Sequence, residues 1–328
     1  MCEWLAVPST QFLLDQVRPD FLLLRTLARG LVMWDHVLPS IDCLKTHMPS
    51  IMKEFAFQQY HVQDDDANID FETMSHAYCN VVAGWCMVIG LKFAGSANEK
   101  AFETLQSCMD KSITVITTPH LIEQAGKTTV ENCMMTVLLS MAMVMAGTGN
   151  LEVMRLCRYF QARQGPPYNQ FLTHGSHMAV SMALGLLFLG GGKYTLSTKP
   201  ESIALMLCAF FPKFPTHSND NRYHLQAFRH LYVLAAEYRT MLPRDVDTGQ
   251  PCYIPMEVRF KDTPFYKDVS YKTSAPCTLP DLDILQEIRI LGPRYWPIVF
   301  HCNKNWDTLK VRYNYFCSLK IKYFLNSV

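Results

Sequence analysis

The sequence predicts a mainly α-helical fold of paired α-α helical repeats, followed by a smaller β-containing region. One stretch recurs three times, and each copy reads as an apolar helix, a glycine and the start of a second helix. Later in the chain, turn residues appear and apolar residues alternate with charged ones, which is typical of strands. We therefore expect a leading helical segment at 1–70, repeats with a following helix at 71–240, a β-containing region at 241–300 and a basic aromatic tail at 301–328.

The charge of the chain is nearly balanced. With 30 basic and 29 acidic residues among 328, the formal net charge is +1, which predicts no general attraction to nucleic acid or to an anionic membrane. The 12 cysteines are scattered without a C-x-x-C pair, as expected of reduced thiols. The opening residues lack the basic and apolar regions of a secretory signal. These features predict a protein of the nucleus and cytoplasm.

The leading segment contains one clear helix, which we expect to be an outer or capping helix. Pro19 can start it, and five apolar residues then recur at helical spacing: Phe21, Leu24, Leu27, Ala28 and Leu31. The acidic stretch at 63–70 lacks the ligand spacing of a calcium loop, so a solvated loop is predicted.

The repeated stretch reads VIGLKFAGSAN from Val88, SMAMVMAGTGN from Ser140 and ALGLLFLGGGK from Ala183. The glycines that end its shared core are Gly95, Gly147 and Gly190. A helix commonly ends on a left-handed residue, and glycine adopts that conformation without steric cost. We interpret these three glycines as structural residues that end the first helix of each repeat.

The residues after each glycine predict a second helix. Ser96 with Glu99 has the spacing of a capping box, and Asn150 can cap directly. The small residues of the first helices predict close packing in an inner layer, and the second helices, at 99–108, 151–163 and 202–211, are expected to form an outer layer.

The third glycine loop is followed by a lysine, as in a phosphate-binding loop. A Walker loop needs a glycine six residues before its lysine and a Ser or Thr after it, but Leu187 and Tyr194 occupy those positions. The sequence therefore predicts neither a nucleotide cofactor nor a small-molecule substrate here.

A helical membrane protein is an alternative, because no charged residue lies between Asn132 and Leu151. The apolar run inside this stretch extends only from Cys133 to Ala146, which is shorter than the roughly 20 apolar residues that span a bilayer. A buried helix of a protein that does not enter a membrane has the same composition, and we favour that interpretation.

Several longer segments resemble one family. The patterns A-G-[ST]-x-N and A-L-G-L-L-x-x-G-G-G are similar to proteasome/cyclosome repeats. The segments PDFLLLRTLARGLVMWDHVLPS from Pro19, HMAVSMALGLLFLGGGKYTLST from His177 and HSNDNRYHLQAFRHLYVLAAE from His217 resemble the family of the largest scaffold subunit of the anaphase-promoting complex. The resemblance runs from about Val7 to Trp296.

This resemblance implies part of a helical toroid followed by a β-rich segment. It also implies a non-catalytic scaffold of a cell-cycle E3 ubiquitin ligase, with the other subunits of that complex as partners in mitotic ubiquitination. The family's scaffold is several times longer than this chain, so we expect a fragment, or a truncated relative that does not assemble or that competes with the longer protein.

The helix after the repeats carries the candidate partner-facing residues. Its expected apolar face comprises five residues: Leu225, Phe228, Leu231, Tyr232 and Ala235. His224, Arg229 and His230 cluster elsewhere and could bind an acidic partner. The spacing of the two histidines is wrong for binding one metal ion from one helix face, so no metal site is predicted.

The β-containing region begins with a clear strand signal. Ile254, Met256, Val258 and Phe260 alternate with charged residues. The triplet at 247–249 (DTG) occurs once, whereas aspartic protease chemistry needs two carboxylates that share a proton, so a turn is predicted. We expect no catalytic residues in this chain.

The tail at 301–328 interleaves basic and aromatic residues. This pattern can contact single-stranded nucleic acid. Because the whole chain is nearly neutral, we favour a divergent ending without a native partner, and the strand pair stays an alternative. The resemblance to the family fades after Trp296.

Overall fold

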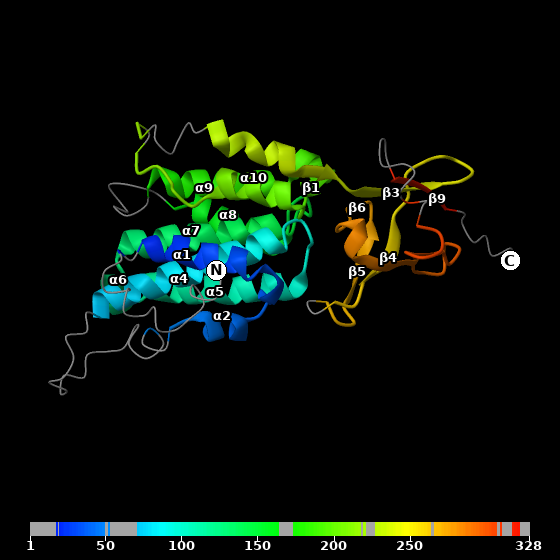
Figure 1. Ribbon diagram of the computed structural model, residues 1–328. Coiled ribbons are helices and arrows are strands. Elements are labelled where there is room, and N and C mark those ends of the chain that lie inside the picture. Colours follow the sequence, from blue (N-terminus) through cyan, green and yellow to red (C-terminus); the bar gives the residue numbers. More distant parts are fainter. Residues whose placement is uncertain are drawn as a thin grey trace.

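The computed structural model describes residues 18, 20–49, 52, 71–163, 173–217, 219–220, 227–263, 266–306, 309 and 317–321. A bundle of nearly parallel and antiparallel helices forms one part of the molecule, and the strands lie beyond one end of this bundle (Figure 1). The mainly α-helical fold with a smaller β-containing region is therefore confirmed.

Four helices form an inner row in which each contacts the next: α1 (Phe21–Val32), α4 (Phe71–Lys92), α7 (Lys127–Val144) and α9 (His174–Leu187). Shorter or more amphipathic helices pack beside them: α2 (Ile41–His47), α5 (Glu99–Thr117), α6 (Pro119–Ala125) and α8 (Leu151–Gln161). The row is the core of the helical part, because every residue of α7 from Cys133 to Val144 is buried.

Small residues set the distance between the inner helices. A Cβ on Gly30 of α1 would lie 2.4 Å from Val88 of α4, and a Cβ on Gly90 of α4 would lie 2.9 Å from Ser140 of α7. Gly30 thus occupies in α1 the place that Gly90 occupies in α4. The helix expected at Pro19 as an outer or capping helix is the end helix of the inner row, where it covers α4. Its place in the row could not be seen from the repeats, because α1 is not followed by the glycine turn.

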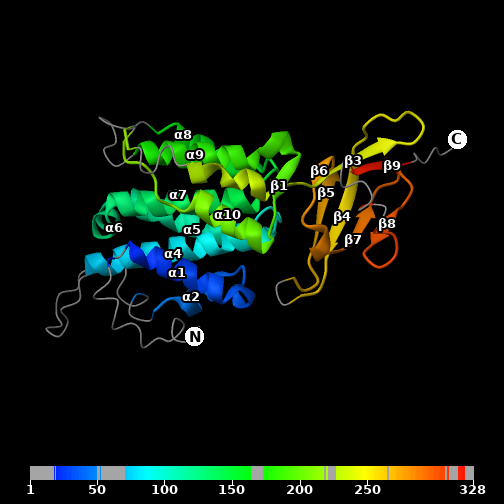
Figure 2. The ribbon, with the colours of Figure 1, turned by 45° about the horizontal axis from the view of Figure 1, so that its top comes forward.

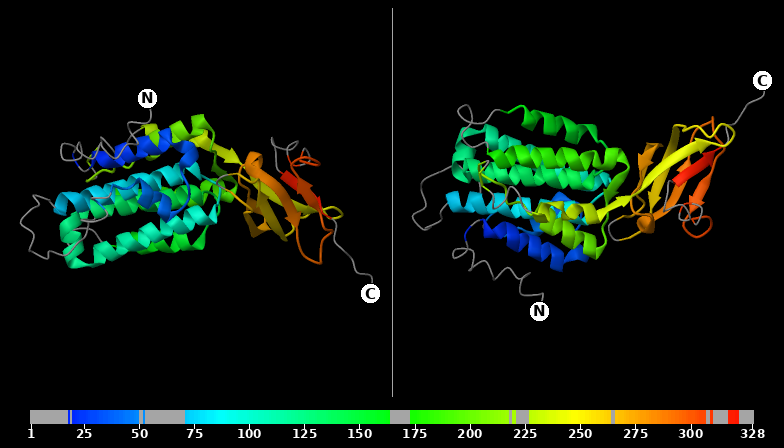
Figure 3. Two further views of the ribbon diagram at one scale, coloured as in Figure 1. Left: turned by 60° about the horizontal axis from the view of Figure 1, so that its bottom comes forward. Right: turned by 90° about the horizontal axis from the view of Figure 1, so that it is seen from above.

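The second helices follow the predicted layer only in part. α5 contacts α4 and α7, and α8 contacts α7 and α9. α10 (Pro200–Phe210) instead packs against α4 and the 3-10 helix η5 (Ala227–Ala235), on the α1 side of the bundle, away from α5 and α8 (Figure 3). The predicted outer position of 202–211 was therefore wrong.

The helix caps differ in one place from the predicted ones. Asn150 accepts backbone hydrogen bonds at the start of α8, as predicted. At α5 the capping side chain is Asn98, which accepts from the Ala101 N–H at 2.8 Å, and Ser96 instead donates to the Phe93 carbonyl. The turn after Gly95 is two residues longer than a capping box at Ser96 requires.

The predicted apolar face after the repeats was wrong in part. Residues 227–235 form a 3-10 helix, in which Ala235 is buried but Phe228 is 63% exposed. A 3-10 helix has three residues per turn, so residues spaced for an α-helix do not gather on one face. Leu225 lies outside the described residues.

Among the described residues, two helices are long and apolar enough to cross a membrane by length and composition. They are Glu72–Lys92, most of which is buried in this fold, and His174–Gly192, of which 39% is buried. The first is a core helix of the inner row. The second leaves one face that no other described residue covers.

The strands form three sheets, with orders β1-β2, β6-β3-β9 and β5-β4-β7-β8. Their bounds are β1 Tyr194–Leu196, β2 Ala236–Tyr238, β3 Thr240–Asp245, β4 Ile254–Phe260, β5 Ser270–Ala275, β6 Cys277–Thr278, β7 Leu285–Ile290, β8 Val299–His301 and β9 Cys317–Ile321. β9 runs parallel to β3, and the other pairs are antiparallel. The strand predicted at 254–260 is β4, with its apolar side buried as predicted.

The tail contributes to these sheets. β8 pairs with β7, β9 pairs with β3, and Trp306 and Leu309 are buried. The favoured expectation of a tail without a native partner is therefore wrong for these segments. Their strands lie in two different sheets and pair with earlier strands of the chain instead of with each other. Of the tail's aromatic residues, Trp306 is within the described part of the chain, and it is buried.

Candidate functional site

The ends of the inner helices meet the β-containing region at one face of the bundle. The glycine turns that follow α4, α7 and α9 lie side by side there, next to β1 and β2 (Figure 2). Since two parts of different architecture join at this face, its contacts decide how rigidly the molecule holds its shape.

Backbone hydrogen bonds link the first two glycine turns to the next helix of the row. The Gly95 N–H donates to the Met143 carbonyl at 2.8 Å, and the Gly147 N–H donates to the Leu186 carbonyl at 3.0 Å. Met143 and Leu186 occupy equivalent positions in their repeats. These two carbonyls also accept from N–H groups at the end of their own helix, so each bond adds a second donor and links neighbouring repeats.

The three repeat glycines have left-handed backbones, with φ of 60° at Gly95, 75° at Gly147 and 57° at Gly190. Each also lacks space for a side chain. A Cβ would lie 2.3 Å from the Thr195 hydroxyl at Gly95, 2.0 Å from the Tyr194 carbonyl oxygen at Gly147 and 2.2 Å from the Tyr194 ring at Gly190. Glycine is thus required both by conformation and by the close approach of β1.

Two threonine hydroxyls connect neighbouring turns. The Thr195 hydroxyl lies within hydrogen-bond distance of the carbonyls of Gly95 (3.3 Å) and Ala146 (3.0 Å). The Thr278 hydroxyl, from β6, does the same for Gly147 (3.3 Å) and Gly192 (2.7 Å). Through Thr278 the β-containing region is hydrogen-bonded directly to the repeat turns.

Replacing Thr195 with valine is expected to destabilise the folded chain by about 1–3 kcal/mol, because the two buried carbonyls lose the one hydroxyl proton that they share. Thr240→Val is the control, since Thr240 makes a similar bond to the Lys193 carbonyl at a half-exposed position and should cost less than about 1 kcal/mol. Urea unfolding followed by circular dichroism measures both. Equal losses for the two variants would contradict the role given to Thr195.

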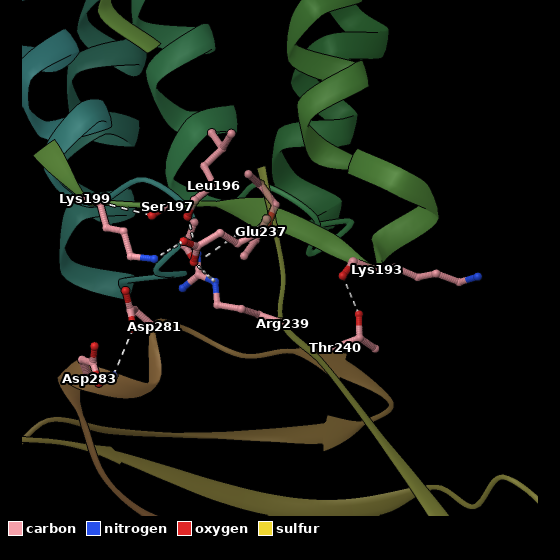
Figure 4. Close-up of polar contacts among 12 residues, drawn as sticks. Lys193, Leu196, Ser197, Lys199, Glu237, Arg239, Thr240, Asp281 and Asp283 are labelled. Carbon is pink, nitrogen blue, oxygen red and sulfur yellow. Dashed lines mark hydrogen bonds and ion pairs between the residues drawn. The ribbon is translucent and has the colours of Figure 1, made fainter. Parts of the chain in front are cut away.

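Charged side chains also stabilise this junction. In Figure 4, Lys199 and Arg239 approach Glu237, whereas Lys193 points away from them. The Lys199 Nζ lies 2.9 Å from the Glu237 carboxylate. Burial alone would raise the pKa of Glu237, but hydrogen bonds from Lys199 and Ser197 and the charge of Arg239 outweigh it and lower that pKa.

Arg239 is the buried member of this group, with 6% of its surface exposed. Its guanidinium donates to the Leu196 carbonyl and lies beside Gly95, where a Cβ would be 2.8 Å away. It therefore joins β2's end to β1 and to the first glycine turn. Sequence reasoning missed Thr195, Arg239 and Thr278, because their partners are backbone carbonyls, which no side-chain pattern marks.

An open trough separates the glycine turns from the β5 strand. Its volume is about 880 Å³, and a second hollow of about 260 Å³ adjoins it along β5. One wall comes from α5 and the turns, including Glu99, Glu103 and Thr148. The other wall comes from β5, including Lys272 and Ser274. With both polar and apolar residues in its walls, the trough is suited to a polypeptide.

The candidate partner-facing residues do not lie together in a single described surface. His224 is outside the described residues, and His230 is exposed on η5. Arg229 turns inward, where its guanidinium donates to the carbonyls of Ala209 and Phe211, both at 3.3 Å, at the end of α10. Burial lowers the pKa of Arg229. Arg229 therefore caps the chain's own helix.

Catalytic and metal chemistry was not predicted. Within the described ranges, no group of three or more His, Cys, Asp or Glu residues is arranged to hold a metal ion. The triplet at 247–249 lies in a turn, in which the Asp245 carboxylate accepts from the backbone N–H groups of Asp247 and Thr248.

Two family models match the chain. One, described as the APC1 fifth domain, matches residues 1–237, and the other, described as the APC1 beta sandwich domain, matches residues 239–323. The second match continues past Trp296, so the resemblance does not fade there as we expected.

Curated relatives match along nearly the whole chain. Anaphase-promoting complex subunit 1 of Homo sapiens is 46% identical over 313 residues, which is 94% of this chain and 16% of the relative. The Arabidopsis thaliana subunit 1 is 40% identical over 89% of this chain and 18% of the relative. A protein named negative regulator of mitosis from Emericella nidulans is 39% identical over 91% of this chain and 14% of the relative. The chain therefore spans less than a fifth of the length of these relatives.

Proposed function

This chain belongs to the anaphase-promoting complex subunit 1 family, and on that premise we propose that it is a non-catalytic scaffold segment of the anaphase-promoting complex. It would organise other subunits of this ubiquitin ligase for ubiquitination in mitosis, in the nucleus and cytoplasm. Its contribution would be positional, since the braced junction holds the helical row and the β-containing region in one arrangement.

The observation that carries this proposal is the uncovered face of α9 at the end of the inner row. Ser181, Gly185 and Phe188 are exposed there, Phe188 to 46%. Within the described residues, a Cβ on Gly185 would meet no atom within 4 Å. A glycine inside a helix lowers stability and calls for a packing reason, which this chain's described residues do not supply at Gly185.

The alignment of the repeats indicates what kind of helix would pack on that face. Gly90 and Gly185 are equivalent positions, and Gly90 receives Ser140 of the next inner helix. A further helix that presents a small residue could therefore pack on Gly185 in the same way. Stacked repeats need covered ends, so an uncovered end favours a segment that works within a larger assembly.

Gly185→Ala is expected to stabilise the isolated chain by about 0.5–1 kcal/mol, because it removes a glycine from an exposed helix position. Gly90→Ala should instead destabilise it by about 1–3 kcal/mol, since the added Cβ would lie 2.9 Å from the Ser140 backbone. Urea unfolding of both variants measures whether each substitution raises or lowers the free energy of unfolding. A loss of stability in Gly185→Ala would show that this face is already packed.

The test of the function is affinity purification of the tagged chain from dividing cells, with quantitative mass spectrometry of the other complex subunits. Recovery of these subunits in near-equal amounts, reduced in Gly185→Phe, is the expected result. Recovery of chaperones alone would indicate a truncated relative that does not assemble. Retention of the chain in membranes after alkaline extraction would favour the membrane alternative instead.

A further inference from the structure

β5 is a free edge of the four-stranded sheet in the part of the chain that the structure describes. It pairs with β4 on one side only. The Phe260 N–H donates to the Val269 carbonyl at 3.0 Å, which makes this pair a hydrogen-bonded one. Hydrogen-bonded and non-hydrogen-bonded pairs alternate along an antiparallel ladder. The backbone groups that point away from β4 are therefore those of Ser270, Lys272 and Ser274.

This edge borders the trough. Ser274 and Lys272 line the larger hollow, Ser270 lines the adjoining one, and Tyr271 lines both. The hollows thus follow β5 along its length. A six-residue strand is about 20 Å long, which suits an extended peptide laid beside it.

The α5 part of the opposite wall carries negative charge, whereas Lys193 lies in the part formed by the glycine turns. Glu99 and Glu103 lie one turn apart on α5, both are exposed, and both line the larger hollow. Neither forms an ion pair with another described residue. Two neighbouring carboxylates above an edge strand favour a basic side chain on whatever pairs with that strand.

We propose that the trough binds an extended segment of a partner subunit, which adds to the sheet as a strand beside β5 and places a Lys or Arg side chain near Glu99 and Glu103. Strand addition gives affinity through backbone hydrogen bonds, and side-chain contacts give specificity. The inference rests on the proposed scaffold function and identifies one of its contact surfaces.

A second copy of this chain fits the edge less well. Pairing of two β5 edges would bring another whole sheet against the wall of α5 and the glycine turns, which closes the trough opposite β5. Lys272 lies at the centre of this edge, and a lysine on an unpaired edge strand disfavours its pairing with the edge of another sheet. A single extended segment meets neither obstacle.

Amide hydrogen exchange with residue resolution, on the isolated chain and on the purified complex that contains it, tests the proposal. In the isolated chain the Ser270, Lys272 and Ser274 amides should exchange rapidly, while the Tyr271 and Thr273 amides are protected by β4. In the complex the first three should slow by about tenfold or more. Unchanged rapid exchange in an assembled complex would overturn the strand addition and leave the scaffold function standing.

Two variant sets test the same surface independently. Ser274→Pro removes an N–H that points to the free edge without removing a β4 bond, and Ser274→Thr keeps that N–H as the control. The proline variant should lose at least half of the protection at Ser270 and Lys272 in the complex, and the threonine variant should not. In the double variant Glu99→Gln with Glu103→Gln, the protection of these amides should fall more steeply than in the wild type when the complex is diluted. The exchange rates of the isolated chain should stay unchanged. Wild-type protection in both sets would overturn the proposal.

If the chain does not enter the complex at all, the scaffold function fails and this inference fails with it. Entry with unprotected β5 amides removes the inference alone. The two failures are therefore distinguishable in one experiment.

Discussion

Gly147→Ala is expected to destabilise the folded chain by about 2–5 kcal/mol. The backbone of Gly147 has a φ of 75°, a conformation that costs an L-residue roughly 1–2 kcal/mol. The added Cβ would also lie 2.0 Å from the Tyr194 carbonyl oxygen, a backbone atom that cannot rotate away. Relieving this overlap requires β1 to move from the turn, which costs a further 1–3 kcal/mol or so.

Gly191→Ala separates the two causes. Gly191 has a similar φ of 67°, but a Cβ there would meet no atom within 4 Å. This control should lose only about 1–2 kcal/mol, the cost of the backbone conformation. The free energies of unfolding come from urea titration followed by circular dichroism. Equal losses for the two variants would mean that the close approach of β1 contributes nothing.

Arg163→Met is expected to destabilise the chain by about 3–5 kcal/mol, because it leaves a buried carboxylate without its partner. Glu131 of α7 has no exposed surface, and both of its oxygens accept from the Arg163 guanidinium, at 2.9 and 2.7 Å. Arg163 follows α8 and also lies over the Phe160 ring, 4.7 Å from its centroid. The pair therefore ties α8 to the inner row.

The double variant Glu131→Leu with Arg163→Met is the control. It removes both charges, so its loss should be smaller than that of Arg163→Met alone. Urea titration of the wild type, both single variants and the double variant yields the coupling energy of the pair. Additive losses would show that the two side chains do not stabilise each other.

Parts of the fold could be predicted because their patterns are local. The apolar runs before Gly95, Gly147 and Gly190 mark helices, since side chains three and four residues apart share one helix face. The alternation from Ile254 to Phe260 marks β4 in the same way, with a period of two. The expected biological process came from the family resemblance, because the spacing of apolar residues carries no information about it.

The candidate site was predicted only in part. The repeat glycines were named, but not the strand that packs on them, because β1 at Tyr194–Leu196 is too short to show a pattern. Arg229 was expected to face a partner and instead caps α10. An arginine in an apolar segment looks the same in sequence whether it reaches outward or binds its own backbone.

The sequence by itself determined the repeat, the helix ends at its glycines and the change to strands. Only the tertiary structure decided that α1 joins the inner row, that α10 leaves the outer layer and that Thr195 and Thr278 connect the turns. The reason is physical: these threonines bond carbonyls between 49 and 131 residues away in the chain. Every residue carries such a carbonyl, so the choice among them depends on the position of the folded backbone.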